Sequence, residues 1–151
     1  MRVGLIVDSA CDLPYEFSRK HDLFVLPVTA VIDGQTYIDK HDPVRTQEFY
    51  QSGLLQKGHQ AETRAFTAQQ IHDLFMEKIV TQFDVAICET VTKTRSLIFQ
   101  NATEAMNSVL ANYEGARHAA GRDGRFFMRV IDSKQIFAGQ GLLAAHTLKL
   151  I

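Results

Sequence analysis

Apolar and polar positions follow two different periods along this chain, and each change of period marks an element. Residues 3–7 form a short apolar run without alternation, which is typical of a strand buried on both faces of a parallel sheet. Residues 24–29, 85–88 and 127–131 predict three further strands. Between the strands, apolar side chains recur at helical spacing. This order predicts an α/β fold with a mainly parallel sheet flanked by helices.

Two amphipathic helices are predicted in the middle of the chain. Thr67 is the natural N-cap of the first, and Ser96 precedes the second. The apolar face of the first comprises Ile71, Leu74, Phe75, Ile79 and Phe83. That of the second comprises Ile98, Ala102, Ala105, Met106 and Val109. The chain is also expected to be helical from Ala138 to its last residue, which would place a third helix at the end.

Shorter signals predict the remaining connections. Asp12, followed by Pro14, indicates a short capped helix after the first strand, and Pro43 begins another that ends near Gly53. Asp33-Gly34 predicts the two-residue turn of an inserted β-hairpin. The segment "AETRAFT" is expected to be a loop up to Thr67, and "EGARHAAGRDGR", at residues 114–125, a flexible surface loop.

Composition narrows the class of protein. The chain has 151 residues, enough for one domain, and a formal net charge of −1, which argues against a broad nucleic-acid-binding surface. No apolar run approaches the about 20 residues of a membrane span, and no signal peptide is visible. Cys11 and Cys88 have no CxxC spacing and predict reduced thiols in a cytoplasmic protein. The six His residues show no metal-ligand spacing.

Candidate site residues follow the predicted strands, because ligands of parallel sheets bind outside the carboxyl ends of strands. Asp8-Ser9 and Asp132-Ser133 occupy equivalent positions, where capping and loop-pinning compete with a ligand role. The segment "ETVTKTRS" places four hydroxyl groups before a helix, those of Thr90, Thr92, Thr94 and Ser96. Hydroxyls beside the free N–H groups of a helix start attract anions, although Ser96 could equally be an N-cap. Thr63 offers a further free hydroxyl.

Signatures of catalysis are missing from the sequence. There is no GxSxG elbow, no Walker loop and no GxGxxG, and the pair Gly139 and Gly141 is a weak signal alone. No His and acid are identifiable as partners of Ser9 or Ser96. We therefore expect no catalytic residue, no cofactor and no metal, and a site that holds an anion with neutral donors.

Taken together and in order, these segments resemble the DegV family of bacterial fatty-acid-binding proteins. The match begins with "VDSACDLP" at residues 7–14 and continues through "LPV", "DGQTYID" and "EFY". It closes with "VIDSKQIFAGQGLL" at residues 130–143. The resemblance implies a domain, residues 1–151, that supplies hydroxyls to the carboxylate of a long-chain fatty acid. A second domain would cover the acyl chain, and a separate fatty-acid kinase would convert the presented acid to its acyl phosphate.

The same resemblance assigns individual roles. Thr63 occupies the place of the family's ligand threonine, and Ser96 that of its ligand serine. Ser9 and Thr92 are further candidate ligand-binding residues because of their positions after predicted strands, not because of the resemblance. Where the family has glycine and threonine after the serine, this chain has Leu97 and Ile98. That change would narrow the carboxylate pocket or shift the hydroxyl role to Thr92 or Thr94.

Two alternatives to a binding protein with this ligand stay open on the sequence. One is a small α/β enzyme or kinase subunit that acts on a phosphorylated or carboxylated metabolite. The other is a relative that has lost the ligand, given Leu97 and Ile98. The apolar end "AGQGLLAAHTLKLI" further suggests the first domain of a longer protein. On that expectation the isolated domain would expose an apolar patch and self-associate.

Overall fold

The computed structural model describes every residue from 1 to 151 and contains two separate β-sheets. The larger sheet comprises β1 (Val3–Asp8), β2 (Phe24–Leu26), β6 (Val85–Thr90) and β7 (Phe127–Asp132). The smaller sheet comprises β3 (Val28–Ile32), β4 (Gln35–Asp39) and β5 (Ala61–Ala65). The helices are α1 (Tyr15–Lys20), α2 (Pro43–Gln51), α3 (Ala68–Leu74), the π-helical turn η1 (Phe75–Ile79), α4 (Ile98–Ala119) and α5 (Phe137–Leu150).

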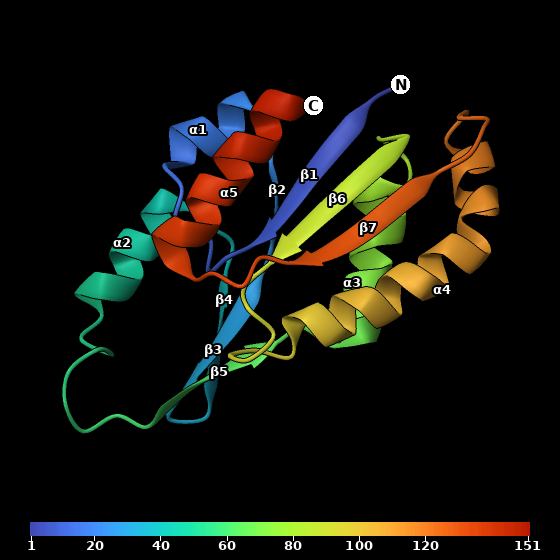
Figure 1. Ribbon diagram of the computed structural model, residues 1–151. Helices are drawn as coiled ribbons and strands as arrows, with labels where there is room; N and C mark the ends of the chain where they lie inside the picture. Colours follow the sequence, from blue (N-terminus) through green and yellow to red (C-terminus); the bar gives the residue numbers. More distant parts are fainter.

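All strands of the larger sheet are parallel and lie in the order β2-β1-β6-β7, which confirms the predicted fold class. Helices α3 and α4 cover one face, and α1 and α5 cover the other (Figure 1). The chain leaves β1 toward β2 on one side, whereas β6 and β7 lie on the other side. The strand order therefore reverses between β1 and β6, and the carboxyl ends of these two strands are the place where a parallel sheet binds ligands.

Strand β1 is buried on both faces, as its unbroken apolar run predicted. Ile6 belongs to the large cluster beneath α3 and α4, while Leu5 and Val7 belong to the small cluster beneath α1 and α5. Successive side chains of a strand point to opposite faces, so one short segment contributes to both cores. The five apolar positions predicted along α4 are all buried in the large cluster.

The smaller, antiparallel sheet lies beyond the carboxyl ends of the parallel strands (Figure 1). Its hairpin β3–β4 is confirmed: Asp33 and Gly34 form the turn with φ of 49° and 79°. The predicted strand at residues 24–29 is divided, because Pro27 separates β2 from β3. Proline has no N–H to donate to a strand ladder, and the chain changes sheet there.

The expectation that Thr63 lies in a loop is wrong. Thr63 is in β5, opposite Ala30 of β3. Its sequence "AETRA" has charged residues at alternate positions and its first four residues are exposed, so it lacked the apolar pattern that marks a strand. Main-chain pairing with β3 and packing of Ala65 on the large core fix it as a strand nonetheless.

Thr67 caps α3 as predicted, and the cap is reciprocal. Its hydroxyl accepts from the N–H of Gln70 at 3.2 Å, and the Gln70 side chain accepts from the N–H of Thr67 at 2.9 Å. This capping box satisfies two main-chain donors that the helix start leaves free. The helix then continues into η1, so that Ile71, Phe75 and Ile79 are all fully buried.

The prediction that Asp12 caps the first helix is wrong. Pro14 is the N-cap of α1, and no side chain caps that helix. The main chain of Asp12 is instead held by the start of α5, because its N–H donates to the carbonyl of Phe137 at 3.2 Å. Cys11 also forms an isolated parallel bridge with Phe137. A tertiary contact across the chain therefore overrides the local capping preference.

Helix α5 packs closely against the loop after β1 because of one glycine. A Cβ atom on Gly141 would lie 2.5 Å from the main-chain oxygen of Asp12. Gly141 of "AGQGLLA" thus serves helix packing. On the outer side of α5, Leu142 and Leu150 remain 75% and 73% exposed. Self-association of the isolated chain stays a prediction that these exposed side chains motivate.

None of the helices is long and apolar enough to cross a membrane.

The predicted loop at residues 114–125 is wrong in its first half, which completes α4. Arg117 within it is 2% exposed. Its guanidinium donates to the carbonyls of Val80 at 2.9 Å and Phe83 at 2.6 Å, and to Asp84 at 3.0 Å. The segment looked solvated because it is rich in charge and glycine. Arg117 nevertheless serves as the polar anchor of α4 over the end of η1.

Replacing this anchor should destabilise the fold. Arg117→Met removes a buried cation and leaves two buried carbonyls and part of the Asp84 carboxylate without their donors. We expect the free energy of unfolding, measured by urea denaturation at neutral pH, to fall by about 3 kcal/mol.

Arg125 provides the matched control, since it lies eight residues further along and is exposed. Arg125→Met should change the unfolding free energy by less than about 0.5 kcal/mol. Equal effects of the two substitutions would contradict the anchoring role of Arg117.

Candidate functional site

One buried carboxylate joins the two strand ends at which the sheet reverses its order. Asp8, the last residue of β1, is fully buried. Its Oδ1 accepts from the N–H of Ala10 at 3.0 Å, and its Oδ2 accepts from the N–H of Val91, after β6, at 2.5 Å. The same Oδ2 accepts from the side chain of Gln140 on α5 at 3.4 Å. Asp8 thus pins loops, which is one of the two roles that the sequence left open.

Asp132 has the equivalent position after β7 and a similar duty. Its Oδ1 accepts from the main-chain N–H groups of Lys93 at 3.3 Å and Lys134 at 3.0 Å. The same two loops are also joined by a main-chain hydrogen bond, in which the N–H of Thr92 donates to the carbonyl of Gln135 at 3.0 Å. The loop between β6 and α4 is therefore tied to β1 by one aspartate and to the loop after β7 by the other.

A second buried acid, Glu89, lies between β6 and α5. It is 2% exposed, and its Oε1 accepts from the hydroxyl of Thr147 at 2.5 Å. Its Oε2 is buried with no partner, as is Oε1 of Gln140. Burial raises the pKa of Glu89 and is also the main cause of a raised pKa at Asp8. Glu89 was not among the candidates from the sequence, because it lies just after the strand predicted at residues 85–88, where an acid is ordinarily exposed.

The two thiols sit beside this cluster and offer no chemistry. Cys11 and Cys88 are both free and buried. Burial raises the pKa of Cys11 to about 12 and raises that of Cys88 as well, with the nearby acid Asp8 adding to both shifts. A thiol held in its protonated form is a poor nucleophile and a poor metal ligand.

Ser9 is almost enclosed, at 8% exposure, and makes structural contacts. Its hydroxyl oxygen accepts from the N–H of Val28 at 3.1 Å, which ties the end of β1 to the start of β3. Its carbonyl accepts from Nε2 of His41 at 2.6 Å, so that this ring nitrogen carries the proton. Ser9 does not line the hollow that contains Ser96. Its role as a ligand donor stays a prediction.

The hydroxyls between β6 and α4 are partly committed to one another. Ser96 Oγ accepts from the N–H of Ile98 at 3.2 Å. Ser96 is not the N-cap of α4, since Leu97 holds that position and Ser96 precedes it by one residue. An accepting hydroxyl keeps its own proton, so Ser96 retains a donor. Thr92 and Thr94 lie 3.2 Å apart, Oγ1 to Oγ1, and one of these two protons serves that bond.

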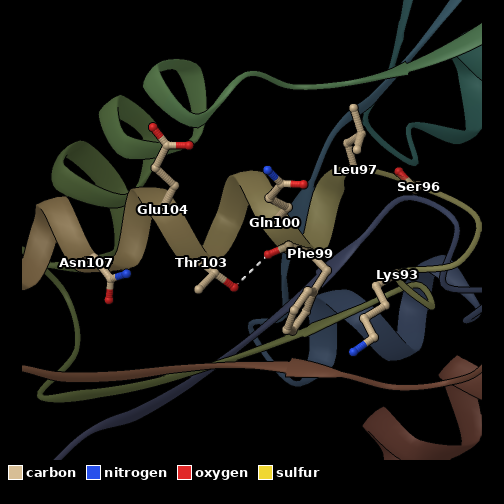
Figure 2. A pocket seen from close by; sticks show the side chains of 8 residues that line it. All are labelled: Lys93, Ser96, Leu97, Phe99, Gln100, Thr103, Glu104 and Asn107. Atoms are coloured by element: carbon tan, nitrogen blue, oxygen red, sulfur yellow. Dashed lines mark hydrogen bonds between the residues drawn. The ribbon is translucent and has the colours of Figure 1, made fainter.

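A hollow of about 530 Å³ runs along the outer side of the first turns of α4 and begins at Ser96. It is lined by Lys93, Ser96, Leu97, Phe99, Gln100, Thr103, Glu104 and Asn107 (Figure 2). Only two of the eight residues, Leu97 and Phe99, are hydrophobic. The six polar or charged side chains that line the hollow can therefore bind a polar or charged group through hydrogen bonds.

The two residues that depart from the DegV pattern have different fates. Ile98 is fully buried in the large core and presents no side chain to a ligand. Leu97 is 64% exposed, and in Figure 2 it points away from Lys93 and Phe99. Lys93 is the lining residue that the sequence reasoning passed over, because that reasoning counted hydroxyl groups. Its ammonium lies 5.8 Å from the centroid of the Phe99 ring.

Thr63 does not line this hollow, but β5 is joined to the start of α4. Asn101 Nδ2 donates to the carbonyl of Phe66, just after β5, at 2.7 Å. Thr63 lies two residues before Ala65, and such residues share one face of a strand. Ala65 packs against the core beneath α4. Thr63 is therefore on the face of the small sheet that turns toward α4, and its role toward a ligand stays a prediction.

The sequence of this chain is similar to those of known proteins of one family. The model of the DegV family of uncharacterised proteins matches residues 2–151. A DegV domain-containing protein of Xanthomonas axonopodis pv. citri is 42% identical over 150 residues, which are 99% of this chain and 48% of that protein. The chain thus spans about half the length of the curated relatives it matches.

Solved structures agree. A stearic-acid-binding protein from Eubacterium ventriosum superposes with a TM-score of 0.79 at 28% identity, over 98% of this chain and 47% of the other. A DegV lipid-binding protein from Thermotoga maritima superposes with a TM-score of 0.81 at 18% identity, over 99% and 48%. The second likeness supports the fold alone.

The buried acid Glu89 generates a prediction about pH. Its pKa is raised on folding, so the unfolded chain loses this proton at a lower pH than the folded chain. The stability that the neutral carboxyl contributes is complete below the unfolded pKa and is lost as the pH rises toward the folded pKa. Glu89→Gln stays neutral and keeps an acceptor for Thr147. We expect its stability relative to wild type to increase as the pH rises above about 4.3, the ordinary pKa of a glutamate in an unfolded chain.

Urea unfolding of both proteins across this range measures the difference directly. The difference is the informative quantity, because Asp84, whose pKa is lowered chiefly by the N–H of Arg2 and then by Arg117, gives wild type and variant the same opposite slope. Glu114→Gln, at an exposed site on α4, is the control and should show no such trend. A difference for Glu89→Gln that is constant with pH contradicts the assignment.

Proposed function

This chain belongs to the DegV family, and on that premise we propose that it binds the carboxylate of a long-chain fatty acid. DegV proteins from Thermus thermophilus and Bacillus subtilis are described as fatty-acid-binding, and the similar structure from Eubacterium ventriosum is that of a stearic-acid-binding protein. In the proposal, Ser96 donates its hydroxyl proton to the carboxylate, and Thr63, Thr92 and Ser9 are the further candidate donors. The role is binding and presentation of the acid, without catalysis by this chain.

One observation carries the proposal: Ser96 keeps a free hydroxyl proton at the mouth of a polar hollow beside the carboxyl end of β6. Its oxygen is oriented by the N–H of Ile98, and the loop that carries it is tied down by Asp8 and Asp132. A donor on a fixed main chain loses little entropy when it binds, which favours affinity. The position is also the one at which parallel sheets hold ligands.

The polar side chains that line the hollow can bind the head of the acid. Six of its eight residues are polar or charged, and Glu104 is among them. We also propose that the acyl chain is covered by a second domain, in keeping with relatives about twice as long as this chain. Residues 1–151 would then be the domain that holds the carboxylate.

Two further parts of the proposal concern the surroundings of the protein. The bound acid would be presented to a separate fatty-acid kinase, as the DegV resemblance implies. The two free, buried cysteines support a reducing compartment, and we propose the cytoplasm.

The first test is extraction of the purified full gene product with organic solvent, followed by mass spectrometry. We expect a straight-chain fatty acid in near-stoichiometric amount, because a buried acyl chain gains about 0.8 kcal/mol per CH₂ and dissociates slowly. Repeated absence of any fatty acid, together with turnover of a small phosphorylated or carboxylated substrate, would contradict the proposal and favour an enzyme.

The second test concerns individual donors. A hydrogen bond to a charged group is worth about 1.5–3 kcal/mol, so Ser96→Ala and Thr63→Ala should each weaken oleate binding about ten- to a hundred-fold. Fluorescence competition or calorimetric titration of the full gene product measures the change.

Ser108→Ala serves as the control, since Ser108 is exposed further along α4. It should bind oleate as wild type does. Unchanged affinity in both the Ser96 and the Thr63 variant would remove these residues from the site and direct attention to Thr92 and Thr94.

A further inference from the structure

We propose that Lys93 supplies the positive charge that pairs with the bound carboxylate, and that it thereby selects ionised acids over neutral lipids of the same chain length. This inference rests on the proposed function and goes beyond it, because the donors considered so far are all neutral. It assigns the selectivity of the site to one residue between β6 and α4.

Lys93 carries an ammonium group that no acid of the chain neutralises. The ion pairs of the protein do not include it, so no carboxylate oxygen lies within 4.0 Å of its Nζ. The acid that shares the hollow, Glu104, projects from α4 in the opposite direction (Figure 2). An unpaired cation that lines the same hollow as Ser96 is available to an incoming anion.

The aromatic ring of Phe99 restricts where this ammonium lies. Lys93 Nζ is 5.8 Å from the ring centroid, within the range of a cation–π attraction. In Figure 2 both side chains point to the same side of α4. A lysine stem has several rotatable bonds, and a contact that holds its charge near the hollow lowers the entropy cost of pairing with a ligand.

The main chain beneath Lys93 is held in place on both sides. Its N–H donates to Asp132 at 3.3 Å, and the N–H of its neighbour Thr92 donates to the carbonyl of Gln135 at 3.0 Å. Lys93 precedes Ser96 by three residues in the same loop. The cation and the hydroxyl donor are therefore presented by one segment of fixed shape.

The sequence around Ser96 also gives a reason for a charge at this position. Ile98 is buried in the core and Leu97 is a hydrocarbon, so neither side chain can donate to a carboxylate. A hydrogen bond with a charged donor and a charged acceptor is about twice as strong as a neutral one. One ammonium group can therefore compensate for missing neutral donors.

Two other cations near this edge of the sheet show what distinguishes Lys93. Arg95 and Lys134 are exposed and also lack an acidic partner, but neither lines the hollow. If only the general positive field of the edge mattered, all three would contribute alike. Lys134 is thus a control of the same charge and residue type at the same end of the molecule.

The experiment compares oleate with oleyl alcohol, which has the same chain and no charge, in calorimetric titrations of the full gene product. We expect Lys93→Met to weaken oleate binding about tenfold or more and to leave the affinity for the alcohol unchanged. Lys93→Arg should retain oleate binding within about threefold, and Lys134→Met should resemble wild type. The Lys93→Met substitution should also remove most of the salt dependence of oleate binding, because the charge of the ammonium group is lost.

Three results overturn the inference: equal oleate affinities for Lys93→Met and wild type, equal losses for Lys93→Met and Lys134→Met, or equal losses for oleate and its alcohol. If one of these three results is found while Ser96→Ala weakens oleate binding, the proposed function stands and the role of Lys93 fails. A wild type that binds neither lipid overturns the proposed function itself, so the two failures are distinguishable.

Discussion

The buried carboxylate of Asp8 is the interaction on which the site depends. It ends β1 and receives hydrogen bonds from the loop after β1, the loop after β6 and the side chain of Gln140 on α5. These three segments are far apart in the sequence and meet at the place where the sheet reverses its order. A carboxylate with three donors can be buried at tolerable cost, because its acceptor positions are satisfied. Without that acceptor, the main-chain N–H of Val91 would lack its partner.

The same cluster shows that two buried acids in one region can have different partners and purposes. Burial raises the pKa of both, but Asp8 has N–H donors that counteract part of this effect, whereas Glu89 has one hydroxyl donor and an unpartnered oxygen. Asp8 therefore organises main chain, and Glu89 attaches the C-terminal part of α5 to β6 through Thr147. Gly141 completes the attachment, since only a residue without a Cβ can approach the oxygen of Asp12 so closely.

Rigidity and ligand contact are divided between different residues at the edge of the sheet. The aspartates fix the main chain, and the hydroxyl of Ser96 and the ammonium of Lys93 stay free on the segment that they fix. Because polar and charged side chains line the hollow along α4, this edge can bind the head of an amphiphile. In the proposed function, the affinity for the hydrocarbon chain comes from surfaces outside these residues, whereas the choice of head group is made here.

The sequence by itself determined the fold class, most elements and the region of the site. The spacing of apolar residues and the turn and cap residues were sufficient to predict β1, the hairpin at Asp33-Gly34, the cap at Thr67 and the buried face of α4. Each of these depends on side-chain pattern or on local main-chain preference. The order of motifs was sufficient for the family. Asp8 and Asp132 were located at strand ends, although their loop-pinning role was only one of two possibilities.

Tertiary structure alone decided the features that depend on partners distant in the chain. β5 has a polar sequence and is a strand because β3 pairs with it, and Arg117 is buried because the carbonyls after η1 need a donor. Asp12 was predicted to cap α1, but its main chain instead contacts the start of α5, which is also distant in the chain. The role proposed for Lys93 became visible only when the fold placed its ammonium group near the Phe99 ring, with no carboxylate oxygen within 4.0 Å. Local pattern reports which face of an element is apolar, but the identity of the group that meets a polar side chain is set by the packing of the whole chain.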